Sequence, residues 1–213
     1  VSSIAPLSAL SHLEVLDIGY GGFTDLEPLS SLITLEELSL AENEIRDIGA
    51  LAPLTNLRVL ELTKNPLNTV TPLRDLINLE ELDLTGTRIG EITPLAELVN
   101  LRVLRLGSNA IADVAPLAML HDLEDLVLGD NPLGNVIPLE GLAKLLSLDL
   151  GYTDLTSIVP LSELTGLHTL LLNGNHINDL APLALLTSLE ELDLSATGID
   201  DVSAVASLIM LRY

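Results

Sequence analysis

The chain has 213 residues, no cysteine and a formal net charge of −22 at pH 7. The lack of cysteine excludes disulfides and thiolate metal sites, and the negative charge repels nucleic-acid phosphates and anionic lipids, so neither is an expected partner. No apolar run approaches the roughly 18 residues of a membrane-spanning helix, so we expect no membrane insertion. Two explanations of the charge stay open, namely solubility in an acidic or saline setting and attraction to a basic partner.

A leucine-rich pattern recurs every 22 residues from one end of the chain to the other. We number each unit from position 0 at its first leucine. A half-unit that ends in Ser3–Leu7 precedes Leu13, nine complete units follow, and three residues come after Met210. A fixed period of this length is typical of a solenoid, in which each unit buries its apolar side chains against its neighbours.

Each complete unit begins with the pattern of a short strand. Positions 3 and 5 are apolar, and position 4 between them is mostly polar, so the leucines point inward and the side chain between them points outward. We expect nine parallel strands about 40 Å across, at about 4.8 Å per strand. They include residues 16–18, 38–40, 60–62, 82–84, 104–106, 126–128, 148–150, 170–172 and 192–194.

Position 8 follows the strand and carries asparagine or threonine in every complete unit after the first, which has Gly21. An inward amide at this point can bond the backbone of its own turn and of the neighbouring turn. We therefore predict a structural ladder, with fewer bonds at the threonines. The ladder residues are Asn43, Asn65, Thr87, Asn109, Asn131, Thr153, Asn175 and Thr197.

The second half of each unit predicts a narrow helical turn. Position 15 is proline in most units, where a fixed φ and a missing N–H suit the first residue of a helix. Leucines at positions 16 and 19 have the spacing of a short 3-10 or single α turn. Asp or Glu at position 12 precedes this turn in six units and can accept bonds from its free amides.

These elements predict an α/β solenoid, a right-handed curved horseshoe with a parallel sheet on its concave face and short 3-10 or α turns on its convex face. We expect a single domain over residues 1–213 without recognisable caps. Since a solenoid end without a cap exposes its core, we expect either that flanking domains are missing from this sequence or that the ends meet by end-to-end self-association.

Positions 2, 4 and 6 are expected to face out of the concave sheet, where acidic and apolar side chains alternate around a lone cation, Arg105. Position 1 alternates Glu and Arg from Glu36 onward and predicts cross-strand ion pairs. Acidic groups mixed with apolar anchors suit a protein interface. The candidate partner-binding residues are Val59, Glu61, Glu81, Asp83, Val103, Arg105, Asp125, Val127, Asp149, Tyr152 and Leu171.

The sequence shows no catalytic or cofactor motif. The four histidines occupy four different unit positions, and no nucleophile elbow or phosphate-binding loop is present. Neighbouring carboxylates such as Glu81 and Asp83 stand in an extended strand, a poor cage for calcium. We therefore expect no enzyme activity, no metal and no cofactor.

The full unit, best seen in residues 101–122 and 167–188 with Asn-x-Ile-x-Asp-(Val/Leu)-Ala-Pro-Leu, resembles the leucine-rich repeat of the bacterial internalin family. The resemblance implies a leucine-rich repeat fold whose concave sheet recognises a protein, with a location at the bacterial cell surface or outside the cell. The helical cap and the immunoglobulin-like domain that flank internalin repeats are not seen in this sequence. The period also resembles that of the intracellular repeat proteins that regulate type-1 protein phosphatase, which implies a cytoplasmic scaffold or enzyme regulator as the alternative.

Overall fold

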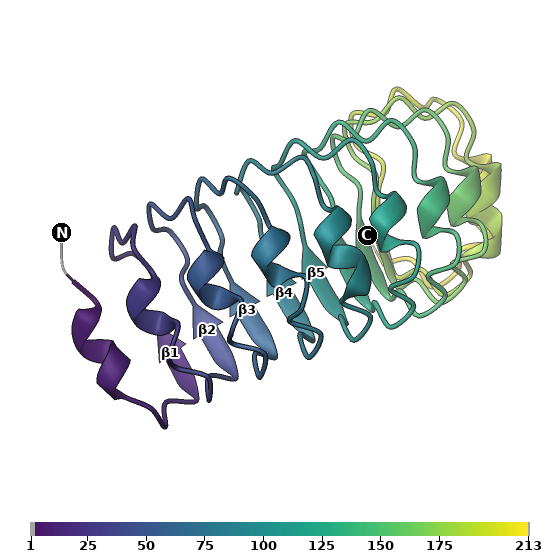
Figure 1. Ribbon diagram of the computed structural model, residues 1–213. Helices are drawn as coiled ribbons and strands as arrows, with labels where there is room; N and C mark the ends of the chain where they lie inside the picture. Colours follow the sequence, from purple (N-terminus) through teal and green to yellow (C-terminus); the bar gives the residue numbers. More distant parts are fainter. Residues whose placement is uncertain (1–2, 213) are drawn as a thin grey trace.

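The computed structural model describes residues 3–212, so Val1, Ser2 and Tyr213 of the predicted domain lie outside the described residues. Nine strands form one parallel sheet in chain order, and each strand residue pairs with the residue one repeat later, as Val15 does with Glu37. Figure 1 shows the coils stacked along a curved path from the purple to the yellow end. The predicted solenoid with nine parallel strands is therefore confirmed. The strands are β1 (Val15–Asp17), β2 (Glu37–Ser39), β3 (Val59–Glu61), β4 (Glu81–Asp83), β5 (Val103–Arg105), β6 (Asp125–Val127), β7 (Ser147–Asp149), β8 (Thr169–Leu171) and β9 (Glu191–Asp193).

Short helical turns return the chain from one strand to the next, and all those within residues 3–212 are 3-10. Most contain proline at the first or second position, where no N–H is needed. None of these turns is long and apolar enough to cross a membrane. They are η1 (Ala5–Ala9), η2 (Glu27–Leu29), η3 (Gly49–Leu51), η4 (Thr71–Leu73), η5 (Thr93–Glu97), η6 (Ala115–Leu117), η7 (Ile137–Leu139), η8 (Val159–Leu161), η9 (Ala181–Leu185) and η10 (Ser203–Ser207).

A side chain at position 12 closes the start of each turn. Asp113 Oδ1 accepts a bond of 2.8 Å from the amide of Ala115, the first residue of η6. Thr69, Asn135 and Ser157, which the acidic pattern did not include, accept the equivalent bond in their own repeats. The turn thus needs an oxygen acceptor at this position rather than a charge.

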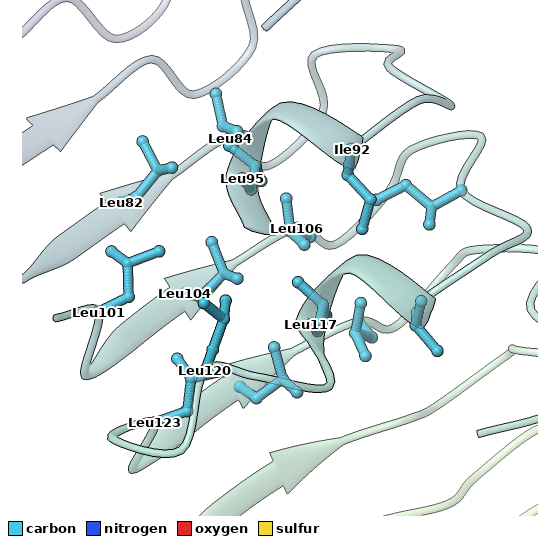
Figure 2. Close-up of a cluster of buried hydrophobic side chains, with 14 of the residues drawn as sticks. Leu82, Leu84, Ile92, Leu95, Leu101, Leu104, Leu106, Leu117, Leu120 and Leu123 are labelled. Carbon is cyan, nitrogen blue, oxygen red and sulfur yellow. The ribbon is translucent and has the colours of Figure 1, made fainter. Parts of the chain in front are cut away.

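The core is a stack of aliphatic columns between the sheet and the turns. Figure 2 shows Leu104 and Leu106 beside Leu117 and Leu120 of the same coil, with the matching Leu82, Leu84 and Leu95 of the preceding coil above them. The first leucines of the second to ninth complete repeats, such as Leu101, are fully buried. Burial of each leucine side chain contributes about 1.5–3 kcal/mol, so the columns supply most of the driving force for folding.

The asparagines at position 8 connect neighbouring repeats. Asn131 Nδ2 donates to the carbonyl oxygens of Leu128 in its own repeat and of Leu106 in the preceding one, while its Oδ1 accepts from the amide of Ile111. The same bonds to both repeats recur at Asn43, Asn65, Asn109 and Asn175. These amides lie buried, except for the half-buried Asn109.

The threonines at position 8 bond differently. Thr87, Thr153 and Thr197 each donate to a carbonyl oxygen of their own repeat, and none bonds the preceding repeat through its side chain. The residue after each threonine has a positive φ, as Arg88 does at 67°. The residues after the five asparagines do not. The side-chain ladder is therefore interrupted between β3 and β4, between β6 and β7, and between β8 and β9.

The core becomes exposed towards both ends of the described chain. Neither η1 nor η10 contains a buried residue. Ile209 is 87% exposed and Met210 is 47% exposed beside η10, and Leu10 is 47% exposed beside η1. These residues leave an apolar surface at each end of the solenoid.

Candidate functional site

Two parallel columns of side chains project from the concave sheet, one from position 2 and one from position 4. The sheet register places each column in line across the strands, since every strand pairs with the next at the same repeat position. Between β3 and β8 the position-2 column reads Val59, Glu81, Val103, Asp125, Ser147 and Thr169. The position-4 column reads Glu61, Asp83, Arg105, Val127, Asp149 and Leu171.

Most of the predicted binding residues are half-buried because their neighbours on adjacent strands stand close beside them. Glu81 is exposed, and Tyr152, which lies just after β7, is 58% exposed. The structure brings Arg105, Val127, Asp149 and Leu171 together on four consecutive strands. Val59 lies on β3, five strands from Leu171 on β8, or about 24 Å at the usual strand spacing. Only an extended partner can therefore contact the whole set.

Position 6 adds little side chain to the concave surface. Ala41, Gly107, Gly129 and Gly151 are buried at this position, whereas Ser195 is exposed and Gly19, Thr63, Thr85 and Asn173 are half-buried. A Cβ at Gly129 would lie 3.1 Å from the carboxylate of Asp149, so position 6 borders the position-4 column. The concave surface therefore consists mainly of the position-2 and position-4 columns.

Arg105 is the one cation at positions 2 and 4 of the nine complete repeats, all of which the structure describes. Its Nη2 lies 2.8 Å from Asp125 Oδ2 on the neighbouring strand, and Asp83 is its neighbour in the position-4 column. The remaining carboxylates of the nine repeats have no cation beside them in their own columns, so the surface keeps its negative charge.

Asp149, on β7, lies in a setting that disfavours its ionised form. Desolvation raises the pKa of its carboxyl group, and the nearby Asp130, Asp125 and Asp193 raise it further, while the bond from the Gly151 amide acts in the opposite direction. Burial and like charges thus both disfavour the ionised form.

The flank of the solenoid, at the start of the strands, holds a second polar surface. The sequence analysis predicted ion pairs at position 1 there but did not identify the asparagines beside them. Arg58 and Arg102 at position 1 pair with the glutamate one repeat later, at 2.8 Å and 2.9 Å. No pair joins either arginine to the preceding glutamate among the described residues, so the predicted alternating charges form separate pairs and not a continuous ladder. Asn56, Asn78 and Asn100 beside them each donate to a backbone carbonyl of the preceding repeat.

These flank residues line a groove of about 600 Å³. The three asparagines recur one repeat apart at the same repeat position, and this recurrence could have indicated the groove from the sequence. Because the amides bond the backbone and the arginines are paired with glutamates, the polar groups of the groove are largely satisfied within the chain. The groove is lined by Glu36, Asn56, Arg58, Asn78, Glu80, Asn100, Arg102 and Asp122.

No group of three or more histidine and carboxylate side chains within residues 3–212 is arranged to hold a metal ion. The surface therefore offers side chains for packing, ion pairing and hydrogen bonding.

Comparison with known proteins identifies the repeat. The family described as "Leucine Rich repeats (2 copies)" matches residues 33–75, 55–97, 77–119 and 165–207. An internalin C2 structure from Listeria monocytogenes shares 37% sequence identity and superimposes with a TM-score of 0.86, over 88% of this chain and 84% of that chain. The chain belongs to the internalin-like leucine-rich repeat proteins.

A second internalin structure, InlF from Listeria monocytogenes, shares 34% identity with this internalin-like chain at a TM-score of 0.95. The match covers 99% of this chain and 62% of that chain, so the chain spans less than two thirds of that relative. A leucine-rich repeat protein from Leptospira interrogans, 23% identical over 99% of this chain and 62% of that chain, has the same fold at a TM-score of 0.82. No curated protein sequence matches.

Proposed function

We propose that this internalin-like chain is a non-enzymatic interaction module that binds a protein partner on its concave sheet. The observation that carries the proposal is the pair of side-chain columns from β3 to β8, where apolar residues and carboxylates alternate on a rigid parallel sheet. Protein interfaces combine apolar anchors with a polar surround in this way. A rigid sheet also binds with little loss of conformational entropy.

The charge of the columns favours a basic partner. The chain carries a net charge of −22, and Arg105 is already paired with Asp125. A partner segment with lysine or arginine would gain attraction over the whole length of the sheet and associate faster at low salt. The same field disfavours nucleic acid and anionic membranes.

The similarity to Listeria internalins at 37% and 34% identity favours a place at the bacterial cell surface or outside the cell over a cytoplasmic regulator of phosphatase type. Protease treatment of intact source cells tests this location. Degradation of the protein without release of cytoplasmic markers is expected, and full protection would favour the cytoplasmic alternative.

Glutamate substitutions test the binding face. Val103→Glu and Val127→Glu replace two apolar anchors at the centre of the two columns by hydrated charges, and Arg105→Glu breaks the pair with Asp125. The loss of apolar contact outweighs the added attraction to a basic partner, because exposed charges are screened at physiological salt. Partner capture from extracts of host or neighbouring cells, compared quantitatively with the unmodified protein, is expected to fall by about tenfold or more, since a loss of 1.4 kcal/mol has that effect.

The matched control carries the same number of glutamates on the convex side. Ala115, Met119 and Ile137 are exposed there on and beside η6 and η7. Capture by Ala115→Glu, Met119→Glu and Ile137→Glu should equal that of the original chain, once circular dichroism shows both triple variants to be folded. Loss of capture in the convex variant with retention in the concave one would reverse the assignment of the face.

A further inference from the structure

Across β6, β7 and β8 the position-4 column places one carboxylate between two apolar side chains. Asp149 pairs in register with Val127 on one side and with Leu171 on the other. All three side chains are half-buried. The carboxylate therefore lies in a narrow apolar frame that is open towards the concave side.

One oxygen of this carboxylate is held by the chain and the other is free. Oδ1 accepts a bond of 2.9 Å from the Gly151 amide. Oδ2 accepts no hydrogen bond from the described residues. Among those residues, Thr63 Oγ1 is the one buried side-chain polar atom without a partner. The unbonded Oδ2 of Asp149 is therefore not buried and is open to solvent. A side chain at Gly129 would bring its Cβ within 3.1 Å of the carboxylate, so glycine leaves the oxygens room.

The other aspartates in the position-4 column lack this frame. Asp83 has the same bond to its own turn, from the Thr85 amide at 2.8 Å, but its neighbours in the column are Glu61 and Arg105. Asp17 lies on the edge strand β1, and Asp193 has Leu171 on one side and no further described strand on the other. Within residues 3–212, Asp149 is the position-4 aspartate with apolar neighbours on both sides.

An aromatic side chain stands at the end of the same strand. Tyr152 comes three residues after Asp149, has a φ of 55° and is 58% exposed. A Cβ at Gly174 would lie 2.4 Å from its ring, so the ring packs directly over the glycine of the next repeat. An exposed aromatic ring thus stands in the loop that follows β7.

We propose that Asp149, between Val127 and Leu171, takes an arginine side chain from the basic partner segment on the concave sheet. This inference rests on the proposed function, to which it adds the chemistry of one contact. A guanidinium group is planar and weakly hydrated, and it stacks on apolar and aromatic side chains while it donates to a carboxylate. The ammonium group of lysine is more strongly hydrated, so it suits a half-buried apolar frame less well.

Titration with a small probe tests the contact without knowledge of the partner. N-acetyl-L-arginine methylamide is added to ¹⁵N- and methyl-labelled protein, and chemical shifts are followed by NMR. The expected changes are saturable and centre on the Gly151 amide and on the methyl groups of Val127 and Leu171. The citrulline counterpart, which has the same shape without the charge, should bind at least about tenfold more weakly because a charged hydrogen bond is lost.

Two aspartate variants separate the site from the general negative field. Asp149→Asn is expected to weaken arginine binding by about tenfold or more, whereas Asp83→Asn, which removes the same charge from the same column, should change it less than about twofold. Equal binding of the citrulline probe, undiminished binding by Asp149→Asn, or an equal loss in Asp83→Asn would each overturn the proposal.

Stability provides a second readout. Because the pKa of Asp149 is raised in the folded chain, the stability linked to this group is lost as pH rises through the folded pKa. Asp149→Asn should therefore unfold at a higher temperature than the original chain at pH 7 while it loses arginine binding. A less stable variant would show that Asp149 serves the fold instead.

Failure of this inference is distinguishable from failure of the proposed function. If Asp149→Asn still captures the partner, and the triple Val103, Arg105 and Val127 variant does not, the concave face binds but the arginine contact is wrong. If the arginine probe binds as expected and the triple variant captures as much partner as the original chain, the site stands and the proposed docking face does not.

Discussion

The turn at position 8 has an asparagine form and a threonine form. The residue at position 9 decides which substitutions position 8 tolerates. Asparagine bonds its own and the preceding repeat and leaves the next residue with an ordinary φ. Threonine makes no side-chain bond to the preceding repeat, although Thr87 and Thr153 lie 3.1 Å from the asparagine Oδ1 of the following one, and it is followed by a left-handed residue. A left-handed L-residue costs about 1–2 kcal/mol, and a proline cannot adopt that conformation.

Asn131→Thr should accordingly destabilise the chain more than Asn109→Thr. Asn131 precedes Pro132, which cannot take the positive φ of the threonine form, while Asn109 precedes Ala110, which can. We expect a loss of about 3 kcal/mol or more for Asn131→Thr and about 1–2 kcal/mol for Asn109→Thr in urea unfolding. Equal losses would show that the following residue does not control the turn.

Thr63 is the opposite case, because removal of its hydroxyl group should stabilise the fold. Its Oγ1 is buried without a hydrogen-bond partner in the described part of the chain. Thr63→Val keeps the shape and removes the unsatisfied group, so the free energy of unfolding should rise by up to about 1 kcal/mol. Thr85→Val, at the same position one repeat later, is the control and should change stability by less than about 0.5 kcal/mol. A destabilised Thr63→Val variant would show that an unseen water satisfies the hydroxyl.

At the scale of the elements, the start of each 3-10 turn should respond to acid through its position-12 acceptor. The hydroxyl and then the amide of Thr93 donate to Glu91 and lower the pKa of its carboxyl group, and the Ser203 amide does the same for Asp201. A carboxyl group whose pKa is lowered by folding stabilises the fold above its unfolded pKa, and this contribution is lost as pH falls through the folded pKa.

Such carboxyl groups take up protons between about pH 5 and pH 3. Over this range the original chain should therefore lose more stability than the Glu91→Gln variant, which has no carboxyl group at this position. The measurement is the midpoint of thermal unfolding across this range. The control is Glu97→Gln, which removes the same charge from a side chain that accepts no hydrogen bond within residues 3–212. It should lose as much stability in acid as the original chain. A Glu91→Gln variant with the same acid response as the original would refute the role of the bond.

The strands and turns could be predicted well from the sequence because the same residue pattern occurs in all nine complete repeats. Leu104, Leu106 and Pro116 recur at fixed spacing in unit after unit, and the fold follows from stacking them. Position 7 was not predicted, since it is left-handed in all nine complete repeats but glycine only at Gly86 and Gly174. The other seven repeats carry tyrosine, charged or small residues at position 7, so the residue type did not indicate the left-handed conformation.

The candidate site was predictable in part for the same reason. The register that sets Val127 and Leu171 beside Asp149 follows from the period. The room that Gly129 leaves for the carboxylate and the resulting half-burial depend on loop geometry after the strand. That geometry has no period-based signature, which is also why the sequence did not predict that position 6 is buried at Gly107 and Gly129 but exposed at Ser195.

At the scale of the whole molecule, we propose that the two apolar ends associate. Ile209 is 87% exposed at one end and Leu10 is 47% exposed at the other. Contact between ends buries this surface, while the net charge of −22 opposes it and is screened by salt. The weight-average mass from light scattering should therefore rise with protein concentration, and more steeply in high salt.

Ile209→Lys should reduce this association. Val99→Lys adds the same charge at an exposed apolar residue away from the ends and should leave the association unchanged. A strictly monomeric protein at high concentration in high salt would refute the role of the ends.

The interrupted asparagine ladder divides the solenoid into cooperative blocks. Asparagine side chains join the repeats of β1 to β3, of β4 to β6, and of β7 with β8, whereas the junctions at Thr87, Thr153 and Thr197 lack this bond. Sheet bonds and leucine packing join the repeats there, together with the exposed ion pair of Arg58 and Glu80 at the first junction.

In a linear array, local opening stops where coupling between neighbours is weakest. Amide hydrogen exchange under mild denaturant should therefore show four groups of amides, each with a shared opening free energy, and the limits between them should coincide with the three threonines. Replacement of Thr153 and the left-handed Asp154 by an asparagine-form turn would merge two groups, so that the protein would open in longer stretches.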